Sequence, residues 1–399
     1  MSTNHQLFKM LDKISTSLDI SSSVYKDAEE KYKAVGQWLA DGEYCLIDKK
    51  ICLKDGEIYA QGSMKIGTVV KPIGQEEFDI DLVFFIPNIC KNTITPEKLK
   101  ELIGDRLKSE NSRYKDKVTS TNRGWCVNYA NQFHLDITPS LDKIDEPYNN
   151  SELVADKKLK TYMSSNPKDY AKWVDNSALQ IPKIRSTQKL FKSDIFMMDG
   201  LFIANESSAT VTELPSHTPT KLLLKRFIQI FKRHRSEIYK NKSDEEKKHK
   251  PSSIIITTLA TKAYLYCIER FEYDNEYDLM LDVLKYMPKY IEIKKSLYWI
   301  ENPTITSENF AEKWNEKPIR KRHFDTWHDN CQHFFNKFHS DMGQDLLFES
   351  LEEGFGKDST QIIRDEYIQE LNKSRKKGLL STAVVTTPTV VKPNTFFGK

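Results

Sequence analysis

The sequence predicts an α+β protein of two lobes, a mixed core of strands and helices followed by a largely helical part. Three observations lead to this fold class. The chain has 399 residues, more than the roughly 250 at which single hydrophobic cores stop growing. Its first half alternates β-like runs with helical stretches, whereas apolar residues from about Thr218 onward recur at helical steps. With 39% hydrophobic and 29% charged residues, the composition is typical of a globular protein.

The first half opens with an amphipathic helix. Serines able to cap it precede Val24, apolar residues continue at helical spacing to Leu39, and Asp41 and Gly42 end it. Short runs rich in β-branched and aromatic residues then predict strands, with one helical stretch between them. The predicted elements are the helix Ser21–Leu39, the strands Glu57–Gln61 and Phe78–Ile86, the helix Thr95–Ser109 and the strand Trp125–Ile137.

The second half is predicted as a helical lobe. Between its helices, the segment Ser236–Pro251 is charged and poor in apolar residues, which predicts an exposed loop after the preceding helix ends. From Arg375 onward the helical period is lost and Thr, Val and Pro accumulate, which predicts a tail. The predicted helices are Leu222–Tyr239, Ser252–Phe271, Glu276–Lys285, Ser307–Lys317 and Phe324–Phe338.

Charge and cysteine content exclude several classes of protein. A net charge of +3 does not fit a molecule coated with positive charge for nucleic acid. The 6 cysteines include no CxxC pair, which suits a reducing compartment. The apolar runs are too short to cross a bilayer, and the N-terminus lacks the apolar core of a signal peptide. These features predict a cytoplasmic protein without membrane contact.

The strongest chemical signal is a pair of acids inside an apolar strand. Asp79 and Asp81 are two residues apart in FDIDLVFFI, so they project from the same face of the strand. Burying two carboxylates together is costly unless cations compensate, and hard divalent ions prefer oxygen ligands. A third acid, Asp136, occurs in the β-like run FHLDITP. Three carboxylates can bridge two ions about 3.5–4 Å apart, the arrangement used in phosphoryl transfer.

The segment QGSMKIGT precedes this strand and suggests a phosphate-binding loop. Gly62 and Ser63 offer flexible backbone and a hydroxyl that can meet a triphosphate, and Gly67 permits a tight turn toward the acids. A lone DxD pair is often a turn, and a lone Gly-Ser is usually a loop. It is their combination that indicates nucleotide chemistry.

The order Gly-Ser-x-x-x-Gly-Thr, DxD in an apolar strand and a later single Asp resembles the polymerase-β-like nucleotidyltransferases. In detail the chain resembles the CD-NTases, the bacterial relatives of cyclic GMP-AMP synthase, over roughly residues 20 to 345. The segments that carry this resemblance are GSMKIGTVVKP, EFDIDLV, FHLDITP, NPKDYAKWV, KRHR, KPSSIIITTLA and ENPTITSENFAEKW.

The resemblance implies a polymerase-β-like core with a long N-terminal helix over residues 1–215, a helical lobe over 216–375 and a flexible tail over 376–399. The active site is then expected in the cleft between the lobes. It also implies an enzyme that joins nucleoside triphosphates into a cyclic oligonucleotide second messenger with release of pyrophosphate, in the anti-phage defence called CBASS. The product would act on an effector protein.

Family roles are carried onto matching positions of this sequence. Asp79, Asp81 and Asp136 are expected to hold two Mg²⁺ ions, with Mn²⁺ as a substitute, and Asp136 also to help deprotonate the attacking hydroxyl. Gly62 and Ser63 are expected to bind the donor triphosphate, ATP or alternatively GTP. Lys232 and Ser253 match positions that reach back to the donor phosphates. Their alternatives are a solvated helix face for Lys232 and a helix cap for Ser253.

Rival interpretations concern the product and the catalytic competence. GSx₃GT and DxD also occur in template-independent enzymes that make linear oligonucleotides or poly(A). A catalytically idle binding module is a second rival, although keeping three costly acids argues against it. Activation by DNA is not expected, because the charge is nearly balanced.

Two further features leave alternatives open. His323, His328, Cys331 and His333 are of metal-ligand type, but their spacing matches no standard zinc pattern, which favours ordinary residues on an amphipathic helix. At the C-terminus, Gly398 suits conjugation by an accessory protein, as in some CD-NTases, whereas Lys399 after it departs from that pattern. The alternatives are docking of Phe396 and Phe397 on a partner, and a disordered end without function.

Overall fold

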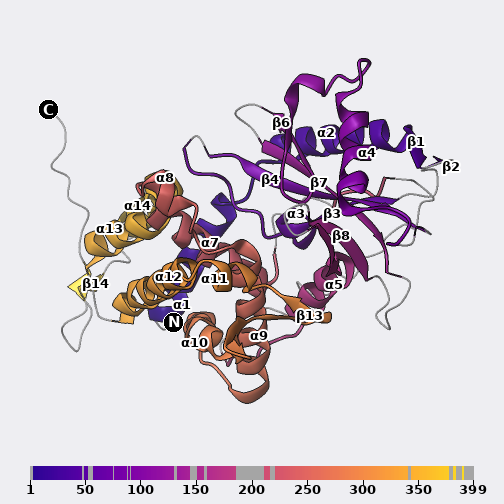
Figure 1. Ribbon diagram of the computed structural model, residues 1–399. Helices are drawn as coiled ribbons and strands as arrows, with labels where there is room; N and C mark the ends of the chain where they lie inside the picture. The colour runs from indigo at the N-terminus through magenta and orange to yellow at the C-terminus, as the bar shows by residue number, and fades with distance from the viewer. Residues whose placement is uncertain are drawn as a thin grey trace, which may run out of the picture.

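The computed structural model has two lobes, a sheet lobe and a helical lobe, as Figure 1 shows. It describes residues 3–46, 49–52, 57–74, 76–87, 89, 91–129, 133–143, 151–156, 160–185, 211–215, 221–339, 343–376, 381–382 and 389–390. Side chains at 3–6, 43–52, 374, 381–382 and 389–390 are outside this description.

The sheet lobe is built on a sheet of 7 strands, ordered β3-β4-β7-β6-β5, with β8 paired to β7 and β9 to β8. Only β4 and β7 pair in parallel among these neighbours. Apolar residues alternate along β4, so that Phe78, Ile80 and Leu82 are buried. The strands are β3 Glu57–Gln61, β4 Phe78–Ile86, β5 Val118–Ser120, β6 Trp125–Tyr129, β7 Phe133–Asp142, β8 Glu152–Asp156 and β9 Thr161–Ser165.

The predictions for this lobe are largely confirmed. β3 and β4 have the expected bounds, and the two expected helices are α2 Ser22–Ala40 and α4 Pro96–Lys108. Both helices begin at a capping hydroxyl and pack on the sheet in one core. The prediction of a single strand over Trp125–Ile137 is wrong, because this stretch contains β6 and the first part of β7, which pair with each other as antiparallel strands.

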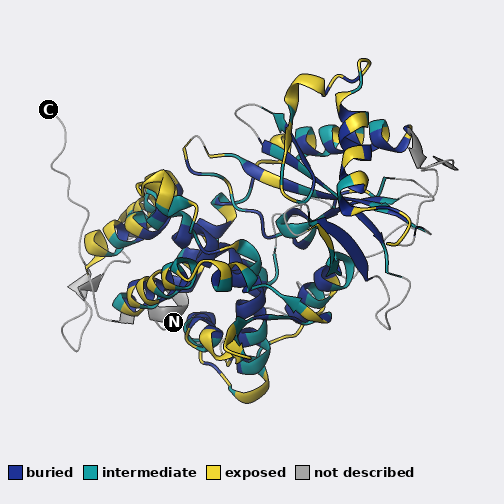
Figure 2. Ribbon diagram, viewed as in Figure 1, coloured by how far each residue is buried: buried dark blue, intermediate teal, exposed yellow. Residues whose placement is uncertain are grey.

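The helical lobe surrounds α7, whose side chains are buried on nearly all sides (Figure 2). The expected helices are found around it except for one, and one expected loop is partly helical. Ser307–Lys317 is not one helix but the strand β13 Ile305–Asn309 followed by the short α11 Glu312–Glu316. Ser236–Pro251 is not only loop, since α7 runs to Lys240 and a capping box at Ser243 starts α8. The helices are α7 Leu223–Lys240, α8 Asp244–Lys247, α9 Ser253–Arg270, α10 Glu276–Tyr286, α12 Ile319–Asn336, α13 Gln344–Phe355 and α14 Lys357–Lys376.

The first helix of the chain, α1 Thr3–Ser17, lies among the helices of the second lobe (Figure 1). Its buried face, Leu7, Phe8, Leu11 and Ile14, shares one core with α7 and α10. The rings of Phe8 and Phe227 are 5.9 Å apart. The chain therefore starts in the helical lobe and crosses to the sheet lobe near Asp19, so the first residues of the expected 1–215 unit pack elsewhere.

Beyond α14 the described part is limited to the paired strands β14 Ser381–Thr382 and β15 Thr389–Val390. Phe396, Phe397, Gly398 and Lys399 lie outside the described residues. No helix within the described ranges combines the length and apolarity needed to span a bilayer.

Candidate functional site

The parallel pairing of β4 with β7 brings the three acids together. In this register Asp81 lies opposite Asp136, and Asp79 lies opposite His134. The intervening residues Ile80 and Leu135 are buried on the other face of the sheet. Asp81 and Asp136 are half-buried, and Asp79 is exposed. The sequence prediction that Asp79 and Asp81 share one face of their strand is confirmed, and the pairing of β4 with β7 adds Asp136 beside them.

The Gly-Ser segment packs directly against Asp81. Gly62 starts the short helix α3 Gly62–Ile66 with a φ of +64°, and a Cβ there would lie 2.1 Å from Asp81 Oδ2. Any side chain at this position would displace the carboxylate. Gly67 ends α3 with a φ of +73°, and the Thr68 amide donates to the Ser63 carbonyl at 2.9 Å. The loop thus folds back beside the acids, as its glycines predict.

Electrostatics show that the acids destabilise one another. Loss of water around the Asp81 carboxyl, with repulsion from Asp79 and Asp136, raises the pKa of Asp81 to about 7, against the opposing pull of Lys232. The same loss of water and repulsion from Asp136 raise the pKa of Asp79. Burial, with Asp136 close by, raises the pKa of the Cys126 thiol to about 12. Positive charge at this place would therefore be strongly favoured.

The helical lobe faces the acids with cations. Burial and neighbouring cations lower the pKa of Lys232 to about 7, against the opposing pull of Asp81. Burial lowers the pKa of Arg235 to about 10, against the opposing pull of Glu76, Tyr239 and Asp79. Burial also lowers the pKa of Lys250, opposed by Glu76 and Asp79. These side chains thus lie within electrostatic reach of the acid cluster, from the far side of the lobe junction.

Lys232 and Ser253 are placed at this junction, each with a protein partner. The Lys232 amine donates to the Thr68 hydroxyl at 2.9 Å and to its carbonyl at 3.3 Å. Ser253 is the first residue of α9, and its hydroxyl accepts from Arg235 Nη1 at 3.1 Å. Lys232 is buried, so the alternative of a solvated helix face is wrong. The N-cap residue of α9 is Ser252, whose side chain makes no capping hydrogen bond.

Sequence reasoning did not find Arg235, Lys250 or His134. Arg235 lies three residues after Lys232 and so on the same helix face, and Lys250 immediately precedes the Pro-Ser-Ser start of α9. His134 shares the face of Asp136 and contacts Glu77 Oε2 through Nε2 at 2.6 Å. Arg235 could have been found by its spacing of three from Lys232 in a helix, and His134 by its spacing of two from Asp136 in a strand.

Asp79, Asp81 and Asp136 are neighbours in the sheet, but within the described ranges no three His, Cys, Asp or Glu side chains are grouped closely enough to form a ready metal site. The four residues considered for zinc have other surroundings. His323 Nδ1 contacts the Tyr239 hydroxyl at 2.8 Å, and His328 Nε2 contacts the Leu284 carbonyl at 2.7 Å. Cys331 is fully buried in the helical core, and His333 is exposed.

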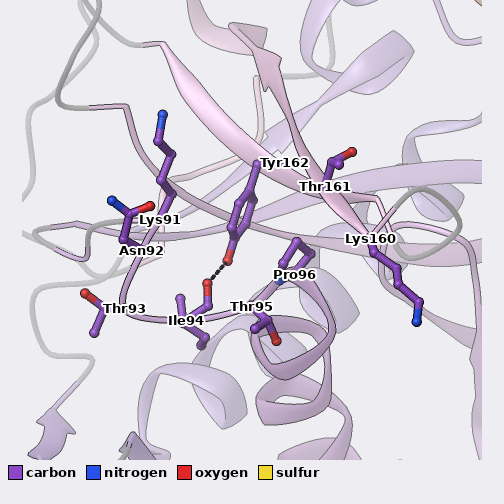
Figure 3. A pocket seen from close by; sticks show the side chains of 9 residues that line it. All are labelled: Lys91, Asn92, Thr93, Ile94, Thr95, Pro96, Lys160, Thr161 and Tyr162. Atoms are coloured by element: carbon purple, nitrogen blue, oxygen red, sulfur yellow. Dashed lines mark hydrogen bonds between the residues drawn. The ribbon is translucent and has the colours of Figure 1, made fainter.

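A cavity of about 380 Å³ lies elsewhere, between the loop before α4 and the start of β9 (Figure 3). Lys91, Lys160 and Tyr162 line it, and the Tyr162 hydroxyl donates to the Ile94 carbonyl at 2.8 Å. It shares no residue with the acid cluster. We assign the chemistry to the acids, because the cavity lining contains no carboxylate, histidine or cysteine side chain.

The chain is similar to known proteins over most of its length. The family profile of the Second Messenger Oligonucleotide or Dinucleotide Synthetase domain matches residues 1–177. A c-di-GMP synthase of Roseivirga ehrenbergii is 27% identical, over 98% of this chain and 97% of the relative. The cyclic dinucleotide synthase CdnG of Bradyrhizobium diazoefficiens is 22% identical, over 78% of this chain and 71% of the relative.

Solved structures share the fold. The CD-NTase CdnG of Bradyrhizobium diazoefficiens, in complex with GTP, superposes with a TM-score of 0.62 at 19% identity, covering 91% of this chain and 97% of the other. CdnC of E. coli MS115-1, with ATP, gives 0.56 at 13% identity, covering 88% and 97%. The expected polymerase-β-like fold with a helical second lobe is confirmed. The profile match, the relatives and the shared fold together indicate a CD-NTase.

Proposed function

We propose that this protein joins nucleoside triphosphates into a cyclic oligonucleotide and releases pyrophosphate. The observation that carries the proposal is the register of β4 and β7, which sets Asp81 opposite Asp136 and beside the Gly62 turn. Two relatives that cover most of the chain are named synthases of cyclic dinucleotides, which supports the same reaction.

The chemistry assigned to the site is a nucleotidyl transfer. A ribose hydroxyl oxygen of one nucleotide forms a bond to the α-phosphorus of another, and the bond from that phosphorus to the bridging oxygen breaks. Pyrophosphate leaves with the electron pair, and Asp136 is assigned the hydroxyl proton. A second transfer within the linear intermediate closes the ring. Lys232, Arg235 and Lys250 lie where they would offset phosphate charge.

Asp79, Asp81 and Asp136 are the residues that would hold the expected Mg²⁺ ions. Carboxylate oxygens suit this hard cation, and Mn²⁺ accepts the same donors. The raised pKa of Asp81 fits a cation, because the charge of an ion would offset the repulsion among the acids. When bound, such ions stabilise the negative charge on the attacking and leaving oxygens.

Incubation with four labelled nucleoside triphosphates and Mg²⁺ tests the proposal, with ATP as the first expected substrate and GTP as the second. The product is treated with phosphatase and weighed by mass spectrometry. A cyclic product keeps its mass, whereas a linear oligonucleotide loses its terminal phosphates. Nucleotide binding without any product would instead support the idle binding module.

Lys232→Ala and Ser63→Ala are expected to raise the KM for the donor triphosphate by about 10-fold, the loss of one charge-assisted hydrogen bond of about 1.5 kcal/mol. Thr68→Val separates two causes for Lys232, since it removes the hydroxyl acceptor and keeps the amine. An effect of Thr68→Val as large as that of Lys232→Ala would assign the lysine to the loop rather than to phosphate. Lys240→Ala, on an exposed lysine of the same helix, is the matched control.

The family resemblance extends the proposal to CBASS defence. There the cyclic product would act on an effector protein, and a partner protein would bind the C-terminal tail. A chain ending at Lys376 keeps α14 whole. This truncation is expected to synthesise product at the wild-type rate in vitro and to protect cells from phage less well. Loss of synthesis by the purified truncated protein would contradict this role for residues 377–399.

A further inference from the structure

We call residues 62–67, which are expected to bind the donor triphosphate, the donor loop. The segment that follows it, residues 68–71, is held by one helix of the other lobe. Three polar side chains of α7, at positions 229, 232 and 233, reach carbonyl oxygens at positions 68 to 71. Gln229 Nε2 donates to the Val69 carbonyl at 2.8 Å, the Lys232 amine to that of Thr68 at 3.3 Å, and Arg233 Nη1 to that of Lys71 at 3.1 Å. Steps of three and four place these side chains on one helix face.

These contacts are buried, so they constrain the loop. Gln229, Lys232 and Arg233 are all at most 7% exposed. A buried polar group without a partner costs about 1–3 kcal/mol, so each side chain resists moving away from its carbonyl. The Lys71 amide also donates to the Leu18 carbonyl at 2.6 Å, where the chain crosses between lobes. The backbone of Lys71 is thus fixed from both sides.

Arg233 differs from the other two because it binds a third segment. Its Nε donates to the Phe355 carbonyl at 3.1 Å, at the turn between α13 and α14, and its Nη2 pairs with Glu237 at 2.8 Å. Gly356 completes this turn with φ +84° and ψ 152°, a conformation nearly confined to glycine. A Cβ at Gly356 would lie 2.5 Å from Glu237 Oε1 and 3.2 Å from Arg233 Nη2.

We propose that Arg233 is a positioning residue, which fixes the position of the donor loop through its hydrogen bond to the Lys71 carbonyl. The turn between α13 and α14 holds the Arg233 side chain in place for this contact. The inference rests on the proposed function for the identity of the loop's ligand. A packing defect at this turn then changes donor binding, although α13 and α14 carry none of the residues assigned to the site.

The paired variant Arg233→Met/Glu237→Met tests this without leaving one buried charge unpaired. Gly356→Ala disturbs the same pair from the turn, and Arg233→Lys keeps the charge but cannot reach all three partners. The control, Arg364→Met/Glu352→Met, removes the ion pair of 3.3 Å that ties α14 to α13 and touches no residue of the donor loop. All variants are assayed below their melting temperatures.

For the paired variant and Gly356→Ala we expect the donor KM to rise about 10-fold, with kcat changed less and the control within about twofold of wild type. Arg233→Lys should recover melting temperature without recovering the KM. A KM that tracks melting temperature alike in all variants, control included, would overturn the inference. If wild type makes no cyclic product, the proposed function fails. The variants and the control are then compared by the rise in melting temperature that ATP or GTP with Mg²⁺ causes in each. Equal rises in the paired variant and control, or no rise in wild type, would overturn the inference as well.

Discussion

Asp79→Asn and Asp81→Asn are each expected to lower the rate of cyclic product formation by about 1,000-fold or more. Asparagine keeps the shape of the side chain but removes the negative charge that would hold a cation beside the transferred phosphate. A loss of about 4 kcal/mol of transition-state stabilisation corresponds to this factor, and metal ions supply several kcal/mol in such reactions. Product is measured by mass spectrometry at saturating nucleoside triphosphate and Mg²⁺.

The control for this experiment is Asp105→Asn, because Asp105 is exposed on α4 and belongs to neither β4 nor β7. It should retain wild-type activity. A rate for Asp81→Asn above one tenth of wild type would remove Asp81 from the catalytic set. Asp136→Asn should behave as the other two, since it is opposite Asp81 in the same register.

The acid cluster could be predicted from sequence because its signals are local. Two acids at a spacing of two must share a face wherever a strand forms, and the apolar residues around Asp79 and Asp81 require a strand. The role of Gly62 could likewise be predicted, because it directly follows β3, where the chain must turn. The proximity of Asp136, 55 positions beyond Asp81, depends on strand pairing and came from family resemblance rather than from pattern.

The cations opposite the acids could not be chosen from sequence. Lys232, Arg233 and Arg235 look like an exposed basic face in KRHR, yet α7 is the central helix of its lobe and buries all three. Burial of these charges on α7 depends on partners about 160 residues away in the sequence, such as Thr68 and Lys71. Local periodicity carries no information about them.

The division into lobes was predicted from the change in periodicity, but not the path of the chain between them. α1 is not among the helices expected from the sequence, and its apolar residues do not reveal which core they join. The expected helix Ser307–Lys317 failed for a related reason. Its apolar residues fit helical steps, whereas hydrogen bonding of Ile305–Asn309 to β12 Glu301–Asn302 makes the first part a strand. Tertiary pairing overrides local pattern in both places.

Without divalent cations, Asp81→Asn is expected to be more stable than wild type at pH 8, by about 1–2 kcal/mol or a few degrees in melting temperature. The folded pKa of about 7 lies above the ordinary 3.8, so the carboxyl costs nothing below about pH 4, and its penalty grows until about pH 7 and then stays constant. The advantage of the variant should therefore shrink at pH 5. The gain in stability is smaller than the pKa alone implies, because Lys232 loses the attraction of the Asp81 carboxylate in Asp81→Asn.

Mg²⁺ should raise the melting temperature of wild type and leave that of Asp81→Asn nearly unchanged, while Asp105→Asn follows wild type throughout. A lower melting temperature for Asp81→Asn at pH 8 in chelator would show that the three acids are stabilised by the protein itself and do not need a cation.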